Sequence, residues 1–427
     1  MDAQFPTIDD CEQAFLVGFN SKENVVAGKN VSYDELKSLT ITAGAEPVDG
    51  YISNQRTINP AFYIGSGKVV EIAETCKKKE IHAVIFDVDL SPAQTRNLEK
   101  SIEVKIIDRT TLILEIFAQR ARTNEGKVQV ELAQLEYLLP RLTNMWTHLS
   151  RQYGGLRTRG PGEKQLESDK RMIQTRIRRL NDLLSTIRKQ RATQRKRRKK
   201  VHLPVIGIVG YTNAGKSTFL HSLTNADVFI EDKLFATLDP TTRLYQFPTG
   251  EKFLFVDTVG FIRNLPHKLV ESFKATLEET KEADVLLHIA DASATDLDSQ
   301  ISAVDSVLKE IGAEKKPILL ALNKVDVLSH KAKKDLQTGN ENAAIISAKY
   351  NYGFAELFSK LRLIMRPDDK RIKLHLPPHK SELLSKLYKH GKVISVEYLD
   401  EYIVVDAFVP EKLIDQTRRY KVKKKVT

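Results

Sequence analysis

Cysteines, long apolar stretches and export signals are scarce or absent in this chain of 427 residues. The two cysteines, Cys11 and Cys76, form no Cys-x-x-Cys pair and there is no histidine cluster, so we expect neither a disulfide framework nor a zinc site. No apolar stretch reaches the roughly 18 to 20 residues that cross a bilayer, and the acidic start lacks the basic and apolar regions of a signal peptide. We therefore expect a cytoplasmic protein without a membrane span, in which both thiols are buried or inert.

What the sequence does contain is a phosphate-binding motif. Residues 210–217 read Gly-Tyr-Thr-Asn-Ala-Gly-Lys-Ser, which fits the form G-x-x-x-x-G-K-[ST]. An aliphatic stretch at residues 204–209 is typical of a buried parallel strand, and residues 218–223 are helix-forming. In this motif the backbone N–H groups turn toward the phosphates, Lys216 reaches the β- and γ-phosphates, and the Ser217 hydroxyl holds Mg²⁺. The sequence thus predicts a nucleoside triphosphate site.

A second motif, Asp-Thr-Val-Gly at residues 257–260, follows a short apolar strand at residues 252–256. The carboxylate of Asp257 can hold magnesium through water, and the N–H of Gly260 can sense the γ-phosphate. Taken alone, the pattern is more often a plain strand exit with Gly260 at positive φ. It indicates nucleotide binding here because it accompanies the phosphate-binding motif.

A third motif, Asn-Lys-Val-Asp at residues 323–326, ends an apolar strand at residues 317–322 and predicts the base. The carboxylate of Asp326 can accept hydrogen bonds from N1–H and the exocyclic amine of guanine, whereas adenine would leave this charge unpaired. The Ser-Ala-Lys motif at residues 347–349 can add a backbone donor, the N–H of Ala348, to the guanine oxygen. Motifs in this order, each ending a predicted strand, predict a doubly wound sheet that binds GTP at that edge.

Between the first two motifs, residues 235–243 are polar, broken by proline and without helical or strand period, as expected of a mobile switch loop. The segment offers three threonines, Thr237, Thr241 and Thr242. We expect one of them to complete the magnesium shell only when the γ-phosphate is bound, which turns hydrolysis into a conformational change. The pattern does not choose among the three.

These motifs together resemble the HflX family, ribosome-associated GTPases of the Obg-HflX-like superfamily of P-loop GTPases. The resemblance covers most of the chain and includes residues 153–163, which look like the family's linker ahead of the nucleotide domain. It implies Ser217 and Thr237 as magnesium ligands beside Asp257, and Lys216, Thr237 and Gly260 as catalytic elements. The motifs and the resemblance together give these nucleotide contacts: Gly210, Tyr211, Thr212, Asn213, Ala214, Gly215, Lys216, Ser217, Thr218, Phe235, Ala236, Thr237, Leu238, Asp239, Asp257, Thr258, Val259, Gly260, Asn323, Lys324, Val325, Asp326, Ser347, Ala348 and Lys349.

The resemblance also implies binding to the large ribosomal subunit and its rRNA, and splitting of stalled or idle ribosomes, by a protein that we expect to be a monomer. Two alternatives use the same motifs. One is a GTPase of rRNA maturation, ribosome assembly or tRNA modification. The other is an RNA-binding adaptor that holds GTP with negligible turnover.

Phe261 bears on turnover, because it stands where many small GTPases carry a glutamine that orients the attacking water. Intrinsic hydrolysis should then be slow, with the missing element supplied by a ribosome that orders the switch loops. A plainer interpretation, compatible with the first, is that Phe261 packs against a neighbouring helix. Asn213 raises the hypothesis that K⁺ neutralises charge at the site, since an asparagine there recurs in GTPases that use K⁺. Arg243 and Arg263 lie near the switches, and we expect them to be exposed, solvated charges.

Positive charge is concentrated in one part of the chain. The net charge is +12, and residues 157–200 alone contain 17 Lys plus Arg against four Asp plus Glu. Residues 189–200 carry eight cations in twelve positions, which suits contact with a phosphate backbone. A charge run is usually only a solvated helix face, and a membrane surface is a weaker alternative. Beside a nucleotide domain, we interpret the block as RNA-binding, with a smaller cluster at residues 418–425.

The length fits two or three domains, and a hydrophobic content of 41% supports ordinary cores. The fold class is α/β. We predict an N-terminal α/β domain at residues 1–125, a helical hairpin with a Gly-rich linker and the basic run at residues 126–200, a GTPase domain at residues 201–367, and a small C-terminal α/β domain with a basic tail at residues 368–427.

Within the hairpin, leucines recur at residues 128–150 and 165–188, the second set at 3-4 spacing. Two such helices should pack antiparallel along these stripes and leave the arginines outside, and Pro140 should kink or break the first helix. Residues 63–68 resemble part of a phosphate loop, but without its glycine spacing we interpret them as a turn into a helix. Shorter patterns predict strands at residues 13–19, 83–86, 104–107, 393–396 and 402–405, and helices at residues 32–38, 92–102 and 380–390.

Overall fold

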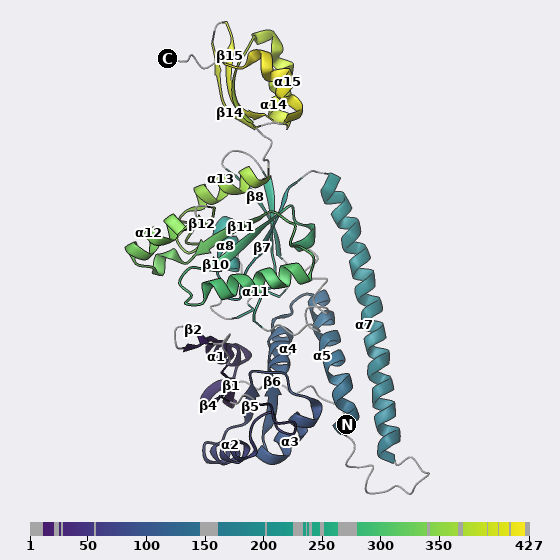
Figure 1. Cartoon of the computed structure of the whole chain (residues 1–427). Coiled ribbons are helices and arrows are strands. Elements are labelled where there is room, and N and C mark those ends of the chain that lie inside the picture. Colours follow the sequence, from purple (N-terminus) through teal and green to yellow (C-terminus); the bar gives the residue numbers. More distant parts are fainter. Residues whose placement is uncertain are drawn as a thin grey trace. The chain divides into compact units, whose positions relative to one another are not determined.

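The computed structural model describes residues 12–20, 25–26, 29–54, 57–145, 161–200, 203–224, 234–235, 237–238, 241–247, 252–263, 280–339, 342–365, 370–390, 392–399, 401–409 and 411–422 (Figure 1). The chain divides into two compact units. Residues 1–245 and 253–352 form the first, and residues 246–252 and 353–427 form the second. The residue ranges of the four domains predicted from the sequence stay predictions.

The N-terminal part of the first unit is a parallel four-stranded sheet covered by helices on both sides. The strands follow the order β4 (Glu46–Ser53), β1 (Gln13–Phe19), β5 (Ala83–Phe86) and β6 (Lys105–Asp108). The helices are α1 (Val31–Ala43), α2 (Ser66–Lys78), α3 (Pro92–Ile102) and α4 (Arg109–Arg120), and a short ribbon joins β2 (Val25–Val26) to β3 (Lys29–Asn30).

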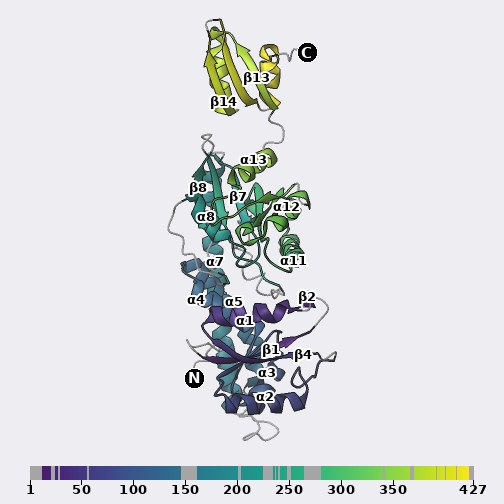
Figure 2. The same cartoon turned by 90° about the vertical axis from the view of Figure 1, so that its left-hand side faces the viewer.

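Alternation along β1 explains the two covered faces. Ala14 and Leu16 belong to the core cluster that includes α1 and α4, whereas Phe15 and Val17 belong to the cluster formed with α2 and α3. Successive side chains of a strand point to opposite faces, so a strand buried on both faces reads as a continuous apolar run. Figure 2 shows α1 on one side of this sheet and α2 and α3 on the other.

Local signals set the helix ends in this region. Ser91 caps α3 through a reciprocal capping box with Gln94, and proline stands in the first turn. These signals confirm the predicted helix at residues 92–102, whereas the helix predicted at residues 32–38 continues to Gly44, which ends α1 at a φ of 100°. The turn predicted near residue 65 is confirmed, since Gly65 caps α2.

Cys76 lies buried on α2, and burial raises the pKa of its thiol to about 11. The thiol therefore stays protonated and poorly reactive at neutral pH, as expected from the sequence. Cys11 lies outside the described residues.

The basic segment folds as the second helix of an antiparallel hairpin. Helix α5 (Asn124–Met145) packs on α7 (Pro161–Lys200). Leu132 of α5 lies in one cluster with Leu184, and Leu142 lies in the next cluster with Ile173, so the two helices run in opposite directions as predicted. Helix α5 continues through Pro140, so of the two predicted outcomes the break is wrong and the kink stays a prediction. Packing of the neighbouring leucines holds the helix although the proline lacks an N–H.

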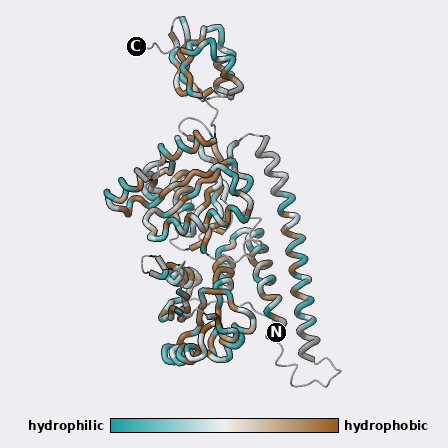
Figure 3. Tube along the Cα trace, viewed as in Figure 1, coloured by the Kyte–Doolittle hydropathy of each residue, from teal (hydrophilic) through white to brown (hydrophobic). Residues whose placement is uncertain are grey.

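The other sheet of the first unit has the order β12-β11-β10-β7-β9-β8, and the strand pairs from β12 to β9 are parallel. In Figure 3 its strands are largely hydrophobic in colour, whereas α7 is mostly hydrophilic. The strands are β7 (Val205–Val209), β8 (Thr241–Gln246), β9 (Lys252–Asp257), β10 (Val285–Asp291), β11 (Ile318–Asn323) and β12 (Ala344–Ile345). The associated helices are α8 (Lys216–Thr224), α11 (Leu297–Glu310) and α12 (His330–Gly339), with the short turn η1 (Val325–Val327).

One expectation for this sheet is corrected. Residues 235–243 were expected to lack strand structure throughout, but β8 begins at Thr241. The β-branched residues Thr241 and Thr242 and the aromatic Tyr245 favour strand structure, which allows residues 241–246 to pair at the edge of the sheet.

The second unit contains a small antiparallel sheet in the order β13-β15-β14. Its apolar side chains form one core with the helices, which includes Leu374, Leu387 and Val405. The elements are α13 (Phe354–Met365), β13 (Lys370–Leu376), η2 (Pro378–Lys380), α14 (Ser381–His390), β14 (Lys392–Tyr398), β15 (Ile403–Val409), α15 (Glu411–Thr417) and η3 (Arg418–Tyr420). Across the parts of the chain that the structure describes, no helix is long and apolar enough to span a bilayer.

A buried polar cluster connects the N-terminal sheet to the phosphate-binding motif. Arg109, the first residue of α4, is 2% exposed and donates to the carboxylates of Asp87 and Glu35. It also donates to the backbone carbonyl of Arg263 at 3.0 Å. Tyr211 donates its hydroxyl proton to Glu35 and accepts the N–H of Arg263 at 2.9 Å. Both backbone groups of Arg263 are therefore bound by this cluster.

Electrostatics make the cluster sensitive to the loss of its cation. Burial raises the pKa of Glu35 and of Asp87, and the neighbouring Arg109 charge opposes that rise. Burial and the Glu35 carboxylate also raise the pKa of Tyr211, so its hydroxyl keeps the proton that it donates. One guanidinium thus compensates two buried carboxylates.

Replacing Arg109 with methionine should lower the free energy of unfolding of the first unit by about 3 to 5 kcal/mol, because two buried carboxylates lose their cation. Arg176→Met is the matched control, since Arg176 is exposed and binds Glu131 on the hairpin surface. Its expected cost is about 0 to 1 kcal/mol. Urea unfolding followed by circular dichroism measures both, and equal losses would show that the buried cluster contributes no more than a surface ion pair.

Candidate nucleotide-binding site

The loop at residues 210–217 leaves β7 and reaches α8 through positions that favour glycine. Gly210 has a φ of 152°, and a Cβ there would lie 2.1 Å from the carbonyl oxygen of Ile289. Gly215 has a φ of 92°, and a Cβ there would lie 2.2 Å from Nδ2 of Asn323. Asn213, at the exposed bend, has a φ of 60°. The loop can pass this close to its neighbours only with glycine at both positions.

The side chain of Lys216 is buried against the backbone of this loop. Its ammonium donates to the carbonyl oxygens of Gly210, at 3.1 Å, and Tyr211, at 2.7 Å. Burial lowers the pKa of Lys216 to about 8, and the nearby Asp257 carboxylate opposes this fall. Thr212 is also buried, and its Oγ1 has no hydrogen-bond partner within the described ranges. The loop therefore presents a cation and an unpaired hydroxyl near its own backbone.

Three oxygen-bearing side chains converge beside Lys216. The Ser217 and Thr237 hydroxyls lie 2.7 Å apart, and Oδ2 of Asp257 accepts from them at 3.1 Å and 2.9 Å. Oδ1 of Asp257 is buried without a hydrogen-bond partner in the described part of the chain. Burial raises the pKa of Asp257, while the Lys216 charge and both hydroxyls oppose that rise. Hydroxyl and carboxylate oxygens are the donors that Mg²⁺ prefers, so this set fits the ion.

The geometry distinguishes among the three switch threonines. Thr237 contacts both Ser217 and Asp257, whereas Thr241 and Thr242 begin β8. Residue patterns left this choice open, because only the fold brings residue 237 next to residue 217. Among the residues that the structure describes, no group of three or more His, Cys, Asp or Glu side chains could hold a metal, so two hydroxyls with one carboxylate remain the metal candidate.

The segment after β9 passes directly over the phosphate-binding loop. A Cβ at Gly260 would lie 2.9 Å from Cγ2 of Thr212 and 3.0 Å from Nζ of Lys216. Phe261 is 1% exposed; its N–H donates to the Gly210 carbonyl at 3.1 Å, and its own carbonyl accepts from the Thr212 N–H at 2.8 Å. The interpretation of Phe261 as a packing residue is confirmed. Its side chain is apolar and cannot orient water by hydrogen bonding.

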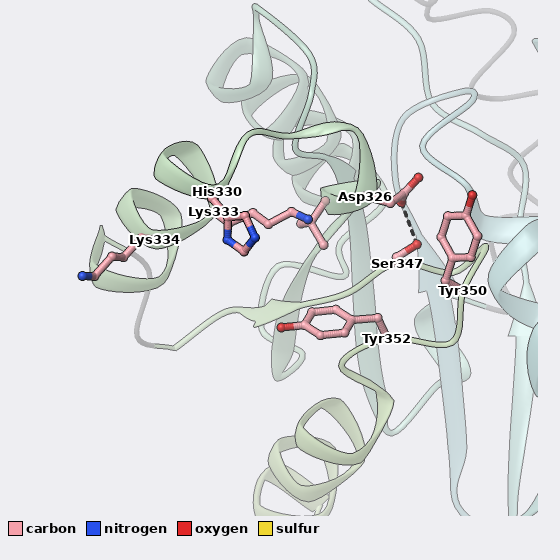
Figure 4. A pocket seen from close by; sticks show the side chains of 8 residues that line it. Asp326, His330, Lys333, Lys334, Ser347, Tyr350 and Tyr352 are labelled. Atoms are coloured by element: carbon pink, nitrogen blue, oxygen red, sulfur yellow. Dashed lines mark hydrogen bonds between the residues drawn. The ribbon is translucent and has the colours of Figure 1, made fainter.

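The base-recognition motifs are bound to the phosphate loop through Asn323. Its Nδ2 donates to the Ala214 carbonyl at 2.8 Å, and its Oδ1 accepts the N–H of Ala348 at 2.9 Å. The Ser347 hydroxyl donates to Oδ1 of Asp326 at 2.6 Å, as Figure 4 shows. The Ala348 N–H, expected to face a guanine oxygen, points at Asn323 here. No sequence pattern predicts this hydrogen bond between the motifs.

Lys324 and Phe235 show how the remaining predicted contacts lie. Lys324 adopts a φ of 62° and binds Asp291 at the end of β10 at 2.8 Å. Phe235 and Leu238 are buried in the core, and the Phe235 ring packs edge-on against Phe117 of α4 with 4.8 Å between centroids. Predicted contacts Ala236 and Asp239 lie outside the described residues.

Arg263 corrects one expectation. It was expected to be exposed, but it is buried, and its guanidinium binds the Asp296 carboxylate just before α11. A buried arginine needs such a partner, and residue 296 lies too far along the sequence for a local pattern to reveal it. Arg243 is half-buried on β8 rather than exposed. The contacts of Glu35 and Arg109 near the site were likewise not predicted, because no sequence motif indicates contacts between residues so far apart in the chain.

A phosphate loop, an oxygen-rich metal candidate and an Asn-Lys-x-Asp motif at one edge of a parallel sheet define a P-loop GTPase. Family models agree with this class over most of the chain. One described as the GTP-binding GTPase N-terminal region matches residues 30–118, one described as the GTP-binding GTPase Middle Region matches residues 120–198, and one described as 50S ribosome-binding GTPase matches residues 205–324. The chain belongs to the HflX family of GTPases.

Two relatives named GTPase HflX support the assignment. The GTPase HflX of Caldanaerobacter subterraneus subsp. tengcongensis is 43% identical and aligns over 96% of this chain and 94% of its own. The GTPase HflX of Escherichia coli K12 is 44% identical over 90% of each chain. A crystal structure of a GTP-binding protein from the archaeon Sulfolobus solfataricus with GDP is 28% identical and covers 83% of this chain and 98% of that one, with a TM-score of 0.44. The family resemblance predicted from the motifs is confirmed.

Gly215→Ala should lower GTP affinity at least about tenfold, because a side chain there is strained at positive φ and collides with Asn323. Gly67→Ala is the matched control, since a Cβ at Gly67 in α2 meets nothing within 4 Å. The control should bind GTP as the wild type does. Titration with a fluorescent GTP analogue measures both affinities, and an unchanged affinity of the Gly215 variant would contradict the assigned role of the Asn323 contact.

Proposed function

We propose that this protein is a Mg²⁺-dependent GTPase that binds the large ribosomal subunit and splits stalled or idle ribosomes. The observation that carries the GTPase chemistry is the convergence of Ser217, Thr237 and Asp257 beside Lys216. Membership in the HflX family and the match to a model described as 50S ribosome-binding GTPase support the ribosomal part.

In this proposal, Lys216 binds the β- and γ-phosphates, and Ser217, Thr237 and Asp257 hold Mg²⁺. The ion would neutralise charge on the β- and γ-phosphate oxygens. The N–H of Gly260 would bind the γ-phosphate, since Gly260 lies close to Lys216. Asn323, Asp326 and the Ser-Ala-Lys motif recognise guanine, with the other predicted nucleotide contacts around them.

Slow intrinsic turnover follows from the same arrangement. Phe261 is buried and apolar, so it cannot orient water in place of a catalytic glutamine. We propose that the ribosome supplies or orders the missing element when it contacts the switch segments. K⁺ near Asn213 is a further candidate for this element, because that side chain is exposed at the bend of the loop.

RNA contact is assigned to the outer face of α7. The cationic side chains described there are exposed, while the leucine stripe faces α5. Such a face binds phosphates in a salt-dependent way through release of counterions. The exposed cations are Arg171, Arg176, Arg178, Arg179, Arg188 and Lys189. A GTPase of rRNA maturation, ribosome assembly or tRNA modification would use the same surface, as would an adaptor with negligible turnover. We also propose that the protein is cytoplasmic and monomeric.

Thr237→Ala should lower GTP hydrolysis and raise the Mg²⁺ concentration required for it by at least about tenfold, the lower end for a lost metal-site group. Thr241→Ala is the matched control, because it removes the same hydroxyl from another threonine of the switch segment, at the start of β8. Phosphate release across a Mg²⁺ titration measures both variants. A larger loss in the Thr241 variant would move the metal site to that residue.

Hydrolysis by the wild-type protein should rise markedly when isolated large ribosomal subunits are added, and Asp326→Asn should lose this rise by weakening GTP binding at least about tenfold. Selective stimulation by mature large subunits favours ribosome splitting, whereas stimulation by assembly precursors or tRNA favours the maturation alternatives. Negligible turnover with every partner, together with intact RNA binding, would favour the adaptor. Equal stimulated rates in K⁺ and Na⁺ would remove the K⁺ hypothesis.

A further inference from the structure

The small sheet of the second unit packs its helices on one face. Leu374 of β13 and its partner Val405 of β15 lie in the core that the sheet forms with α14 and α15. Figure 1 shows both helices on the same side of the sheet. Side chains alternate along a strand, so the neighbouring positions face away from this core. We call that side the open face, and it includes Arg371, Lys373 and His375 of β13 with Tyr402, Asp406 and Phe408 at β15.

Positive charge is concentrated on the β13 side of the open face. Arg371, Lys373 and His375 occupy every second position of β13, and all three are exposed. Arg362 of α13 adds a cation, because its guanidinium lies 4.4 Å from the centroid of the Phe408 ring. Phe408 pairs directly with Arg371 across the two strands. Like charges at such neighbouring positions repel one another, and an anionic ligand would relieve this repulsion.

The carboxylate next to these cations holds one of them in place. Asp406 is 5% exposed and accepts from Nε and one Nη of Arg371 at 3.2 Å and 2.8 Å. This bidentate pair fixes the guanidinium on the sheet and leaves N–H groups that the pair does not use. Glu397 adds a negative charge only on β14, beyond β15. Arg371 is therefore a pre-oriented donor for an anion such as a phosphate.

An aromatic pair lies at the other end of the open face. The rings of His375 and Tyr402 stack with 4.4 Å between centroids and an angle of 20° between planes. Four residues separate Arg371 from His375, which corresponds to about 13 Å along an extended strand. Cations that bind phosphates and rings that stack on bases are the two components of single-strand nucleic-acid sites. An acidic peptide would use the cations but would not need the rings.

The basic segment near the C-terminus lies against the edge of β13. Lys421 forms an antiparallel bridge to β13, and the N–H of Val422 donates to the carbonyl of Lys373 at 3.0 Å. Arg418 and Arg419 of η3 are exposed, and η3 also contacts β13. Two cationic segments about fifty residues apart in sequence are thus brought to one strand, which extends the positive charge beside the open face.

We propose that the open face binds single-stranded RNA, with phosphates at Arg371 and Lys373 and one base stacked on the pair formed by His375 and Tyr402. The assignment rests on the proposed association with RNA and adds a contact in the second unit that is separate from α7. None of the predicted GTP contacts lies on this face. RNA bound there does not compete with GTP for the same side chains.

The test uses the full chain with GTP and a short polyuridine RNA that contains thiouridine. Photo-crosslinked peptides are quantified by mass spectrometry across an RNA titration, which gives separate half-maximal RNA concentrations for the open face and for α7. Tyr402→Leu should raise the value for the open face at least about fivefold, in the range for a lost stacking ring, and Tyr402→Phe should not. Tyr388→Leu is the matched control, since it removes a ring that is 61% exposed on α14.

Absence of crosslinks on the wild-type open face would overturn the proposal. Equal half-maximal concentrations for the leucine and phenylalanine variants at residue 402 would do the same. Circular dichroism checks that each variant is folded.

A matched lysine pair tests the phosphate contact at an exposed position, where folding is not at risk. Lys373→Ala should make the dependence of the half-maximal concentration on salt shallower by about 0.7 in a double-logarithmic plot, the value for one phosphate contact on a single strand. Lys386→Ala removes the same charge from α14, where Lys386 pairs with Glu382, and its slope should stay near wild type. Equal slopes for both variants would indicate diffuse electrostatics and contradict the contact.

Two further readouts keep the outcomes separate. If polyglutamate displaces the RNA from the open face and Tyr402→Leu leaves RNA binding there unchanged, the face is an acidic-protein site and the proposal is wrong. Stimulation of GTP hydrolysis by large ribosomal subunits is measured alongside with the wild type. If stimulation is absent while the open face crosslinks RNA, the proposed ribosomal function fails alone. If stimulation is present without these crosslinks, only the assignment of the open face fails.

Discussion

The side chain of Asn323 holds the nucleotide site together. It donates to the Ala214 carbonyl in the phosphate loop and accepts the N–H of Ala348 in the Ser-Ala-Lys motif. Three sequence motifs therefore meet on one amide. The same contact explains why residue 215 is glycine, since any Cβ there would collide with this amide. Asn323 can play this part because β11 ends beside β10 and β7 in a parallel sheet, where loops from neighbouring strands share an edge.

A second constraint comes from the N-terminal sheet. Arg109 and Tyr211 bind the carbonyl and the N–H of Arg263, three residues beyond Gly260. Any displacement of Arg263 must therefore break hydrogen bonds to a cluster in which one guanidinium compensates two buried carboxylates. Such a rearrangement is costly unless new partners replace the old ones. The segment that follows Gly260 is thus energetically tied to Arg109, 154 positions earlier in the chain.

The sequence predicted what is local and missed what the fold brings together. The strand at residues 13–19, the helix at residues 92–102 and the loop at residues 210–217 were predicted because apolar runs, capping residues and glycine spacing are written in neighbouring positions. Strand β13 was missed although its apolar residues alternate, since Lys373 and His375 separate them. The Arg109 cluster and the burial of Arg263 were not predictable, because each depends on partners from distant segments.

This protein contains two kinds of polar interaction that respond differently to salt. Guanine and phosphate recognition uses short, buried hydrogen bonds around Asn323 and Lys216, which salt screens weakly. The exposed cations of α7 act at long range, and their affinity for a phosphate backbone falls steeply with salt. If α7 binds RNA as proposed, the RNA affinity varies with ionic conditions while nucleotide selectivity stays constant, because the buried contacts around Asn323 and Lys216 are screened less than the exposed cations.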